Sequence, residues 1–156
     1  MRRRRPEKRE AIPDPKYFSP LVAKFINAVM VEGKKSTAEK IVYGAFDILK
    51  QKAGEEDIVK IFNKAIDNVR PRVELKPRRV GGATYQIPVE VDINRGTSVA
   101  MRWIRDFSRT KKGRPMTNKL ADELLAAYKG EGPAVKKRDE THKMAEANKA
   151  FAHLRW

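Results

Sequence analysis

The sequence predicts a mainly α-helical protein: a single domain of about six helices, with a protruding two-stranded β-hairpin between the third and fourth helices and a basic N-terminal arm. Three observations lead to this fold class. Most of the chain repeats apolar residues at the period of a helix, one central stretch repeats them at the period of a strand, and the first residues are polar. At 156 residues the chain suits one core. We therefore expect an arm at 1–18 and a helical domain at 19–156.

The expected arm is strongly basic. Its cations within the first nine residues are Arg2, Arg3, Arg4, Arg5, Lys8 and Arg9. Residues 1–18 are too polar, and too often interrupted by proline, to pack against a core. We expect the arm to be disordered in the free protein and to order when it binds a partner.

Two amphipathic helices are expected to follow the arm. Ser19 and Pro20 predict a helix start, because serine caps helices and proline suits the first helical position; this helix continues until Gly33. Residues 36–39, Ser-Thr-Ala-Glu, have the spacing of a capping box and open the second helix. That helix ends before Gly54.

A third helix is expected from about Asp57 until Pro71, which cannot continue it. Glu55, Glu56 and Asp57 form a carboxylate cluster at its start. The positive end of the helix dipole favours negative charge there, so the cluster indicates capping rather than acid–base catalysis.

The apolar period changes from 3.6 to 2 between about residues 72 and 91, which predicts a β-hairpin. Gly81 and Gly82 supply the positive backbone angles that a tight connection needs. Pro77 and Pro88 cannot donate ladder hydrogen bonds, so the ribbon is expected to stand alone against the helices.

The pairing that we expect in this hairpin places apolar residues at its base and cations at its tip. The expected pairs are Val73 with Val91, Leu75 with Val89 and Arg79 with Tyr85. Tyr85 is expected to pack at the ribbon rather than to stack on a base.

Three more helices complete the prediction. The fourth begins after Thr97 and has an apolar face opposite a row of arginines. The fifth runs from Met116 and is ended by Gly130, and a highly charged sixth runs from Pro133 toward Trp156, over about 133–156.

Charge identifies the class of partner. The chain has 35 Lys and Arg against 20 Asp and Glu, a formal net charge of +15, and such an imbalance favours binding to nucleic acid. No apolar run approaches the roughly 20 residues of a membrane span, so we expect no membrane partner. The absence of cysteine and of an export signal agrees with a cytoplasmic protein.

Catalytic, metal and cofactor sites are not expected. His142 and His153 lie 11 residues apart, about three helical turns, and the chain has no Cys to complete a zinc site with them. Gly33, Lys34 and Lys35 resemble the end of a phosphate-binding loop, but the preceding glycine of that motif is missing. We therefore predict no enzyme activity.

Basic clusters recur in unlike parts of the chain, which indicates contact with phosphates over much of the surface. Beyond the arm, the candidate RNA-binding residues are Lys34, Lys35, Arg72, Lys76, Arg95, Arg102, Arg105, Arg109, Lys111, Lys112, Arg114, Lys136 and Lys137. This spread is more typical of a protein embedded in folded RNA than of a reader of one DNA groove. A basic DNA-binding architectural or regulatory protein stays open as the alternative.

Several long sequence segments resemble a known protein family. SPLVAKFINAVMVEGKKSTAEKIVYGA, NVRPRVELKPRRVGGATYQIPVEV, AMRWI and AVKKRDETHKMAEANKAFAHLRW closely resemble, in order and spacing, the bacterial small-subunit ribosomal protein seven family. The resemblance covers nearly the whole chain. It departs at residues 92–97, where a more basic stretch would be expected, so that Arg95 is the cation expected to contact RNA there, and at Leu154, where an aromatic is common.

The resemblance implies a non-enzymatic, monomeric protein that binds ribosomal RNA of the 3-prime major domain early in assembly and organises the head of the small subunit. It implies that ribosomal proteins nine and eleven are neighbours, and that the hairpin lies near the exit site for transfer RNA and the messenger RNA path. The tip residues that the resemblance assigns to the hairpin are Arg78, Arg79, Gly81, Gly82 and Thr84. Lys34 and Lys35 would belong to a turn that faces RNA.

Overall fold

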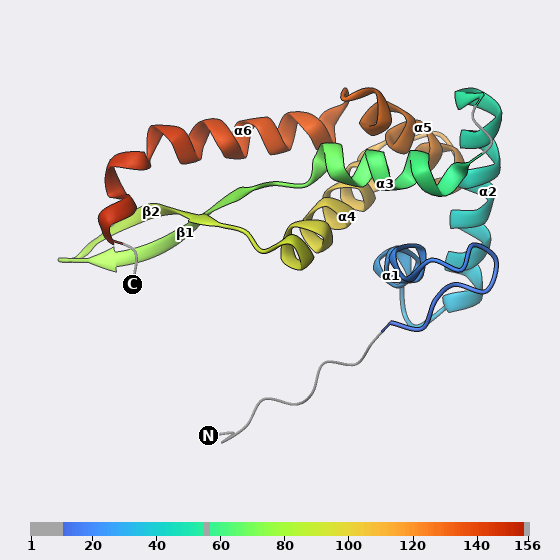
Figure 1. Cartoon of the computed structure of the whole chain (residues 1–156), viewed down its shortest axis with the longest axis horizontal. Coiled ribbons are helices and arrows are strands. Elements are labelled where there is room, and N and C mark those ends of the chain that lie inside the picture. The colour runs from blue at the N-terminus through green and yellow to red at the C-terminus, as the bar shows by residue number, and fades with distance from the viewer. Residues whose placement is uncertain (1–10, 55–56, 155–156) are drawn as a thin grey trace, which may run out of the picture.

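The computed structural model describes residues 11–54 and 57–154 and confirms the predicted fold class (Figure 1). The elements are α1 (Pro20–Val29), α2 (Lys35–Ala53), α3 (Ile58–Val69), β1 (Val73–Val80), β2 (Ala83–Glu90), α4 (Ile93–Thr110), α5 (Met116–Lys129), α6 (Pro133–Ala147) and a 3-10 helix, η1 (Lys149–Leu154). Helices α1 to α5 form a body. The hairpin and α6 extend from it side by side (Figure 1).

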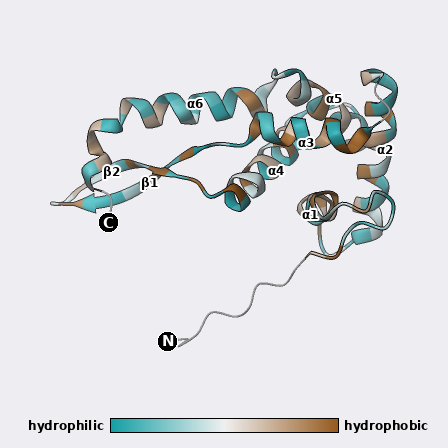
Figure 2. Ribbon diagram, in the orientation of Figure 1, coloured by the Kyte–Doolittle hydropathy of each residue, from teal (hydrophilic) through white to brown (hydrophobic). Residues whose placement is uncertain are grey.

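The body is held together by apolar faces of its five helices. Three phenylalanines from three helices form its centre: the ring of Phe62 lies 5.1 Å from that of Phe25 and 5.2 Å from that of Phe46. All three are fully buried. In contrast, α6 is hydrophilic along most of its length (Figure 2), and its buried side chains are Ala134, Val135 and Ala145.

Local capping signals are confirmed at four helix ends. The Ser19 hydroxyl accepts a hydrogen bond from the Val22 amide, and the Asp57 carboxylate accepts from the Val59 and Lys60 amides. The bond from Lys60 is the main reason why the pKa of Asp57 is lowered. At the other ends, Gly54 and Gly130 adopt left-handed backbone, φ 68° and 79°, beyond α2 and α5.

The expected capping box at residues 36–39 is wrong, as is the continuation of the first helix to Gly33. Helix α1 ends at Val29, and α2 begins at Lys35, so Ser36 lies inside its first turn. The reason is a tight turn in which Gly33 has φ 75° and accepts a hydrogen bond from the Lys35 amide at 2.8 Å. The chain therefore enters the helix earlier, without a side-chain cap.

Helix α4 begins at Ile93, earlier than the predicted start after Thr97. The Asp92 carboxylate accepts a hydrogen bond from the Asn94 amide at 3.1 Å and caps the helix there. This aspartate belongs to the stretch, residues 92–97, where a more basic sequence was expected.

The sixth helix is also shorter than predicted. It ends at Ala147 and is followed by η1, while residues 155 and 156 lie outside the described part. The Asn148 side chain donates a hydrogen bond to the Met144 carbonyl at 2.8 Å, and this bond competes with continuation of the helix.

The hairpin is confirmed, but its expected register is wrong by one residue. Its two-residue turn is Gly81 and Gly82, with φ of 58° and 90°, whereas the expected pairing implied a three-residue loop. Turn length fixes register, so every pair shifts. The observed pairs include Val73 with Glu90, Leu75 with Pro88, Arg78 with Tyr85 and Arg79 with Thr84.

The shift changes which residues anchor the hairpin. Ile87, only 1% exposed, is the buried residue of the two strands, whereas Leu75 is half-buried. The packing role predicted for Tyr85 is confirmed, because its ring lies 5.1 Å from that of Phe151 in η1. The last turn of the chain therefore supports the hairpin near its tip.

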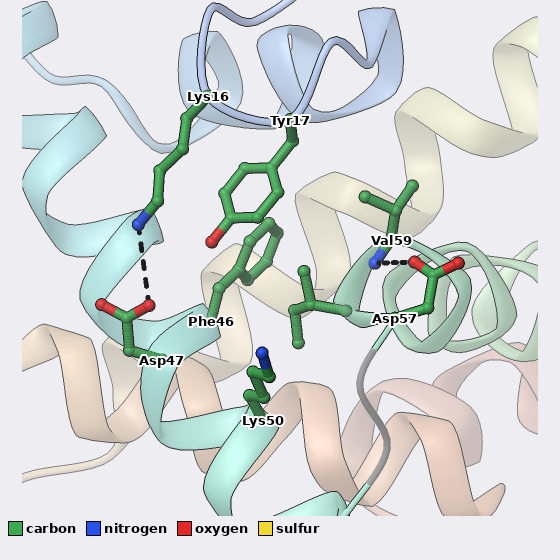
Figure 3. Close-up of a pocket in the computed structure, with 8 residues that line it drawn as sticks. Lys16, Tyr17, Phe46, Asp47, Lys50, Asp57 and Val59 are labelled. Carbon is green, nitrogen blue, oxygen red and sulfur yellow. Dashed lines mark hydrogen bonds and ion pairs between the residues drawn. The ribbon is translucent and has the colours of Figure 1, made fainter.

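The expectation that residues 1–18 do not pack is wrong for Asp14 and Tyr17. Asp14 is 2% exposed and accepts a hydrogen bond from the Tyr43 hydroxyl at 2.6 Å. Burial, and then this bond, raises the pKa of Tyr43. The Tyr17 ring lies edge-on against Phe46 with centroids 5.4 Å apart (Figure 3). These polar and aromatic contacts replace the aliphatic pattern that would have signalled packing.

Candidate nucleic-acid interface

A groove between α1 and α4 gathers cations from the two helices. It has a volume of about 490 Å³, and Lys24, Arg102 and Arg105 line it together with uncharged residues. Arg102 is exposed and has no acidic partner among the residues that the structure describes. Lys24 was not among the predicted site residues, because in the sequence it stands alone and only helix packing brings it beside Arg102.

The predicted row of arginines on α4 has a second role inside the protein. The Arg105 guanidinium donates a hydrogen bond to the Ala28 carbonyl at 3.2 Å, and Arg109 donates to the Val29 carbonyl at 3.1 Å. Positive side chains at these last carbonyls of α1 suit the negative end of its dipole. Arg105 and Arg109 thus join α4 to α1, although Arg109 stays exposed, whereas Arg102 is exposed and makes no such contact in the described part of the chain.

The turn before α2 exposes Lys34 and Lys35. Lys34 forms an ion pair with Glu32 at 2.9 Å, and Lys35 forms one with Glu39 at 3.9 Å. These pairs are largely in water, where such contacts contribute about 0–1 kcal/mol and exchange readily. Both ammonium groups can therefore meet a phosphate.

The cations of the basic segment after α4 have different surroundings. Lys111 lies 2.6 Å from Oε2 of Glu123, a carboxylate with no exposed surface whose Oε1 accepts a hydrogen bond from the Ala134 amide. Lys111 is therefore used to neutralise a buried charge. Lys112 is exposed, and Arg114 shares the carboxylate of Asp122 at 3.2 Å.

Asp122 also accepts a hydrogen bond from Lys52 at 2.6 Å, and this bond is the main reason why its pKa is lowered. The carboxylate stays ionised between two cations from different elements. Arg114 is thereby shared between this pair and any external phosphate.

The hairpin presents its predicted tip residues to solvent. The exposed residues are Arg78, Arg79, Gly81, Gly82 and Thr84, and neither arginine has an acidic partner in the described part of the chain. Toward the base, Glu74 pairs with Arg95 at 2.9 Å and with Lys76 at 3.5 Å. The hydrogen bond that Arg95 donates to the Glu74 carboxylate raises the pKa of Arg95. Arg95 and Lys76 are thus partly neutralised.

The base of the hairpin is tied to α6 by a residue that the sequence did not single out for this purpose. The Arg72 amide donates a hydrogen bond to Nε2 of His142 at 3.0 Å. Burial, followed by the nearby charge of Arg138, lowers the pKa of His142, so the neutral ring is the form that accepts this bond. The Arg72 side chain remains exposed.

The cations at the start of α6 also differ in their surroundings. Lys136 is exposed, and Lys137 lies 3.9 Å from Glu140. Arg138, their neighbour, donates a hydrogen bond to the Asn68 carbonyl and pairs with Asp139 at 2.5 Å, so it joins α6 to α3. The predicted arm cations, residues 2–9, lie outside the described part of the chain.

Charge also argues against an anion site in a second cavity. This cavity, of about 540 Å³, lies between the segment before α1, α2 and the start of α3 (Figure 3). Lys16 and Lys50 line it together with Asp47 and Asp57, so its charges balance. Lys16 pairs with Asp47 at 3.6 Å.

Residues 11–54 and 57–154 lack the features of a membrane span and of a metal site. No helix there has both the length and the apolar character needed to cross a membrane. Nor does that part of the chain hold three His, Cys, Asp or Glu side chains grouped as a metal site would require.

Comparison with known proteins gives one consistent result. A family model described as Ribosomal protein S7p/S5e matches residues 1–149. The small ribosomal subunit protein uS7 of Thermotoga neapolitana is 59% identical over 156 residues, and that of Fervidobacterium nodosum is 60% identical, each with 100% of both chains covered. The uS7 protein of an Anaeromyxobacter species is 59% identical over 155 residues, 99% of each chain.

Proposed function

Because the chain belongs to the ribosomal protein S7p/S5e family, we propose that it works as a primary ribosomal RNA-binding protein that nucleates assembly of the small-subunit head. The family consists of ribosomal proteins rather than enzymes, and the chain is a protein of the small ribosomal subunit.

The observation that carries the proposal is the spread of exposed cations that lack acidic partners in the described part of the chain. They lie on separate elements: Arg102 in the α1–α4 groove, Arg78 and Arg79 at the hairpin tip, Lys112 after α4 and Lys136 on α6. The packed body holds the cations of different helices at fixed separations. A folded RNA junction whose phosphates match those separations would bind with the release of many counterions.

The hairpin supports a second part of the proposal. The two arginines at its tip have no acidic partner among the residues that the structure describes. The hairpin projects away from the body beside α6 (Figure 1). Such a finger can reach transfer RNA at the exit site and messenger RNA while the body stays on ribosomal RNA. Ribosomal proteins nine and eleven are the proposed neighbours in the head, and the cytoplasm is the proposed location.

Chemical footprinting tests the proposal directly. The purified chain should protect one discrete junction in the 3-prime major domain of small-subunit ribosomal RNA. Its affinity should fall by roughly 0.7–0.9 log units per log unit of salt for each phosphate neutralised. Equal protection of arbitrary duplex DNA, or an affinity that hardly changes with salt, would refute the proposal.

A further inference from the structure

Two neighbouring aromatic residues before α1 have opposite environments. Tyr17 packs against Phe46, whereas Phe18 is 82% exposed. Phe18 immediately precedes Ser19, the N-cap of α1, and an apolar residue in that place often packs back onto the fourth helical residue. Here that residue is Ala23, and the exposure of Phe18 shows that the ring leaves almost all of its surface in water. Helix capping therefore does not explain the phenylalanine.

The backbone at Phe18 is strained, although the exposed ring gains little packing. Its φ is 50°, in the left-handed region that bulky residues rarely adopt. Glycine would adopt this backbone without strain, so phenylalanine here opposes folding and gains little packing in return. Strained residues of this kind are concentrated at binding sites.

The turn that carries Phe18 is fixed from several sides. The Phe18 amide donates to the Asp14 carbonyl at 2.8 Å, and the Asp14 amide donates to the Ser19 carbonyl at 3.3 Å. The buried Asp14 carboxylate also accepts from the amides of Lys16 and Tyr17, at 3.1 and 3.0 Å. The ring is therefore presented by an ordered base, which reduces the conformational entropy lost when a ligand binds.

The surroundings of Phe18 are basic. A groove of about 400 Å³ begins at the next residues, Ser19 and Pro20, and is also lined by Lys24 and Arg70. Its acidic residue is Asp67, which pairs with Arg70 at 3.0 Å. The six cations of residues 2–9 precede the turn in the same chain. An exposed aromatic ring beside a positively charged groove is the combination that binds single-stranded nucleic acid, through base stacking and phosphate contact.

We propose that Phe18 is a stacking platform for an unpaired RNA base, with Lys24 and Arg70 of the adjoining groove near the phosphates of the same strand. This inference rests on the proposed RNA-binding function. It adds a contact that recognises single-stranded RNA to a surface otherwise built for phosphates.

The first experiment is ultraviolet cross-linking of the full chain to small-subunit ribosomal RNA, followed by mass spectrometry. Because photochemical coupling without a linker requires contact between ring and base, the peptide that contains Phe18 should carry a nucleotide. Absence of any adduct on this peptide, while other peptides of the chain are cross-linked, would overturn the inference.

Binding measurements with four variants supply the second test. Phe18→Ala should weaken binding roughly tenfold, since base–aromatic stacking is worth ~1–3 kcal/mol and 1.4 kcal/mol is tenfold. Phe18→Trp should bind like the wild type, and Phe18→Leu should be as weak as Phe18→Ala because leucine has no π-face. Ile12→Ala, which changes another exposed apolar residue of the same segment, should bind like the wild type.

Stability and binding are expected to separate at this position. Phe18→Gly should raise the Tm, because it relieves the left-handed strain, and should still weaken RNA binding. If Phe18→Leu binds like the wild type while Ile12→Ala is weakened, the segment makes an apolar contact, as with a protein, and stacking is refuted. If all variants bind normally, the inference fails and the proposed function stands. If the wild type protects no ribosomal RNA, both fail.

Discussion

Cations have different roles in the body and in the hairpin. In the body, Arg105 and Arg109 donate to the last carbonyls of α1, and Lys111 neutralises the buried Glu123. At the hairpin tip, Arg78 and Arg79 have no acidic partner in the described part of the chain. A large positive charge therefore does not measure the extent of an RNA-binding surface, because some of the cations stabilise the fold itself.

The body and the hairpin also differ in how many apolar side chains they bury. The body surrounds Phe25, Phe46 and Phe62 with apolar side chains from five helices, whereas Ile87 is the buried residue of the two strands. The hairpin therefore depends on neighbours outside its own sheet, namely α6 and η1.

The largest effect is expected in the centre of the body. Phe62→Ala should lower the free energy of unfolding by about 3–5 kcal/mol, because it opens a cavity among fully buried side chains. Ile87→Ala should lower it by about 2 kcal/mol and should speed amide hydrogen exchange mainly in residues 73–90. Urea unfolding and hydrogen exchange measure both effects. Equal losses in the two variants, with exchange raised throughout the body, would show that hairpin and body unfold as one unit.

A matched lysine pair separates cations of the fold from cations of the surface. Lys111→Ala should destabilise the protein by about 2 kcal/mol, because it leaves the buried Glu123 without a counter-charge. Lys112→Ala, one residue further along, should change stability by less than about 0.5 kcal/mol. Chemical unfolding measures the difference.

A second substitution tests the cause of that destabilisation. Adding Glu123→Gln to Lys111→Ala should recover part of the loss, because the amide oxygen can still accept from the Ala134 amide without leaving a buried charge. Similar stabilities for Lys111→Ala and Lys112→Ala would contradict the buried ion pair as an important contact.

A smaller effect is expected at the joint between hairpin and α6. The pKa of His142 is lower in the folded state than the ordinary value of about 6.5, mainly because the ring is partly buried. Between the folded-state pKa and about pH 6.5, the unfolded state therefore binds more protons at His142 than the folded state does. The contribution of neutral His142 to stability is complete above about pH 6.5 and declines as the pH falls toward the folded-state pKa.

His142→Gln should remove this part of the pH dependence, since glutamine can accept a hydrogen bond but does not titrate. The difference in stability between wild type and variant should shrink from pH 7.5 to pH 5.5 in urea unfolding. Parallel profiles for the two proteins would exclude His142 as the titrating group.

The smallest effect on stability is expected at the hairpin tip. Combined Arg78→Ala and Arg79→Ala should change the free energy of unfolding by no more than about 0.5 kcal/mol, because both side chains are exposed. Head assembly should continue, and occupancy of the exit site by transfer RNA, or reading-frame accuracy, should change in reconstituted subunits.

The matched control removes two arginines of the body. Combined Arg105→Ala and Arg109→Ala should lower stability, because they delete the contacts to the carbonyls of α1, and should leave the exit site unaffected in subunits that form. Loss of head assembly in the hairpin variant, with normal exit-site behaviour in any subunits formed, would show that Arg78 and Arg79 are assembly contacts.

The sequence alone determined the features that arise from short-range chemistry. The capping groups of Ser19 and Asp57 and the left-handed Gly54 and Gly130 set helix ends where they were predicted. The change of apolar period marked the hairpin, and the paired glycines marked its turn. These signals are readable because the interacting groups lie within a few residues of one another.

The tertiary structure decided which cations belong to the fold and which remain at the surface. Lys111 and Lys112 are adjacent and chemically identical, yet only the packing of α5 and α6 places a buried carboxylate beside the first. The same holds for Asp14 and Tyr43, 29 residues apart, and for Arg105 and Ala28, 77 residues apart. The physical reason is that these contacts depend on how helices pack, and local sequence does not specify which distant polar groups that packing brings together.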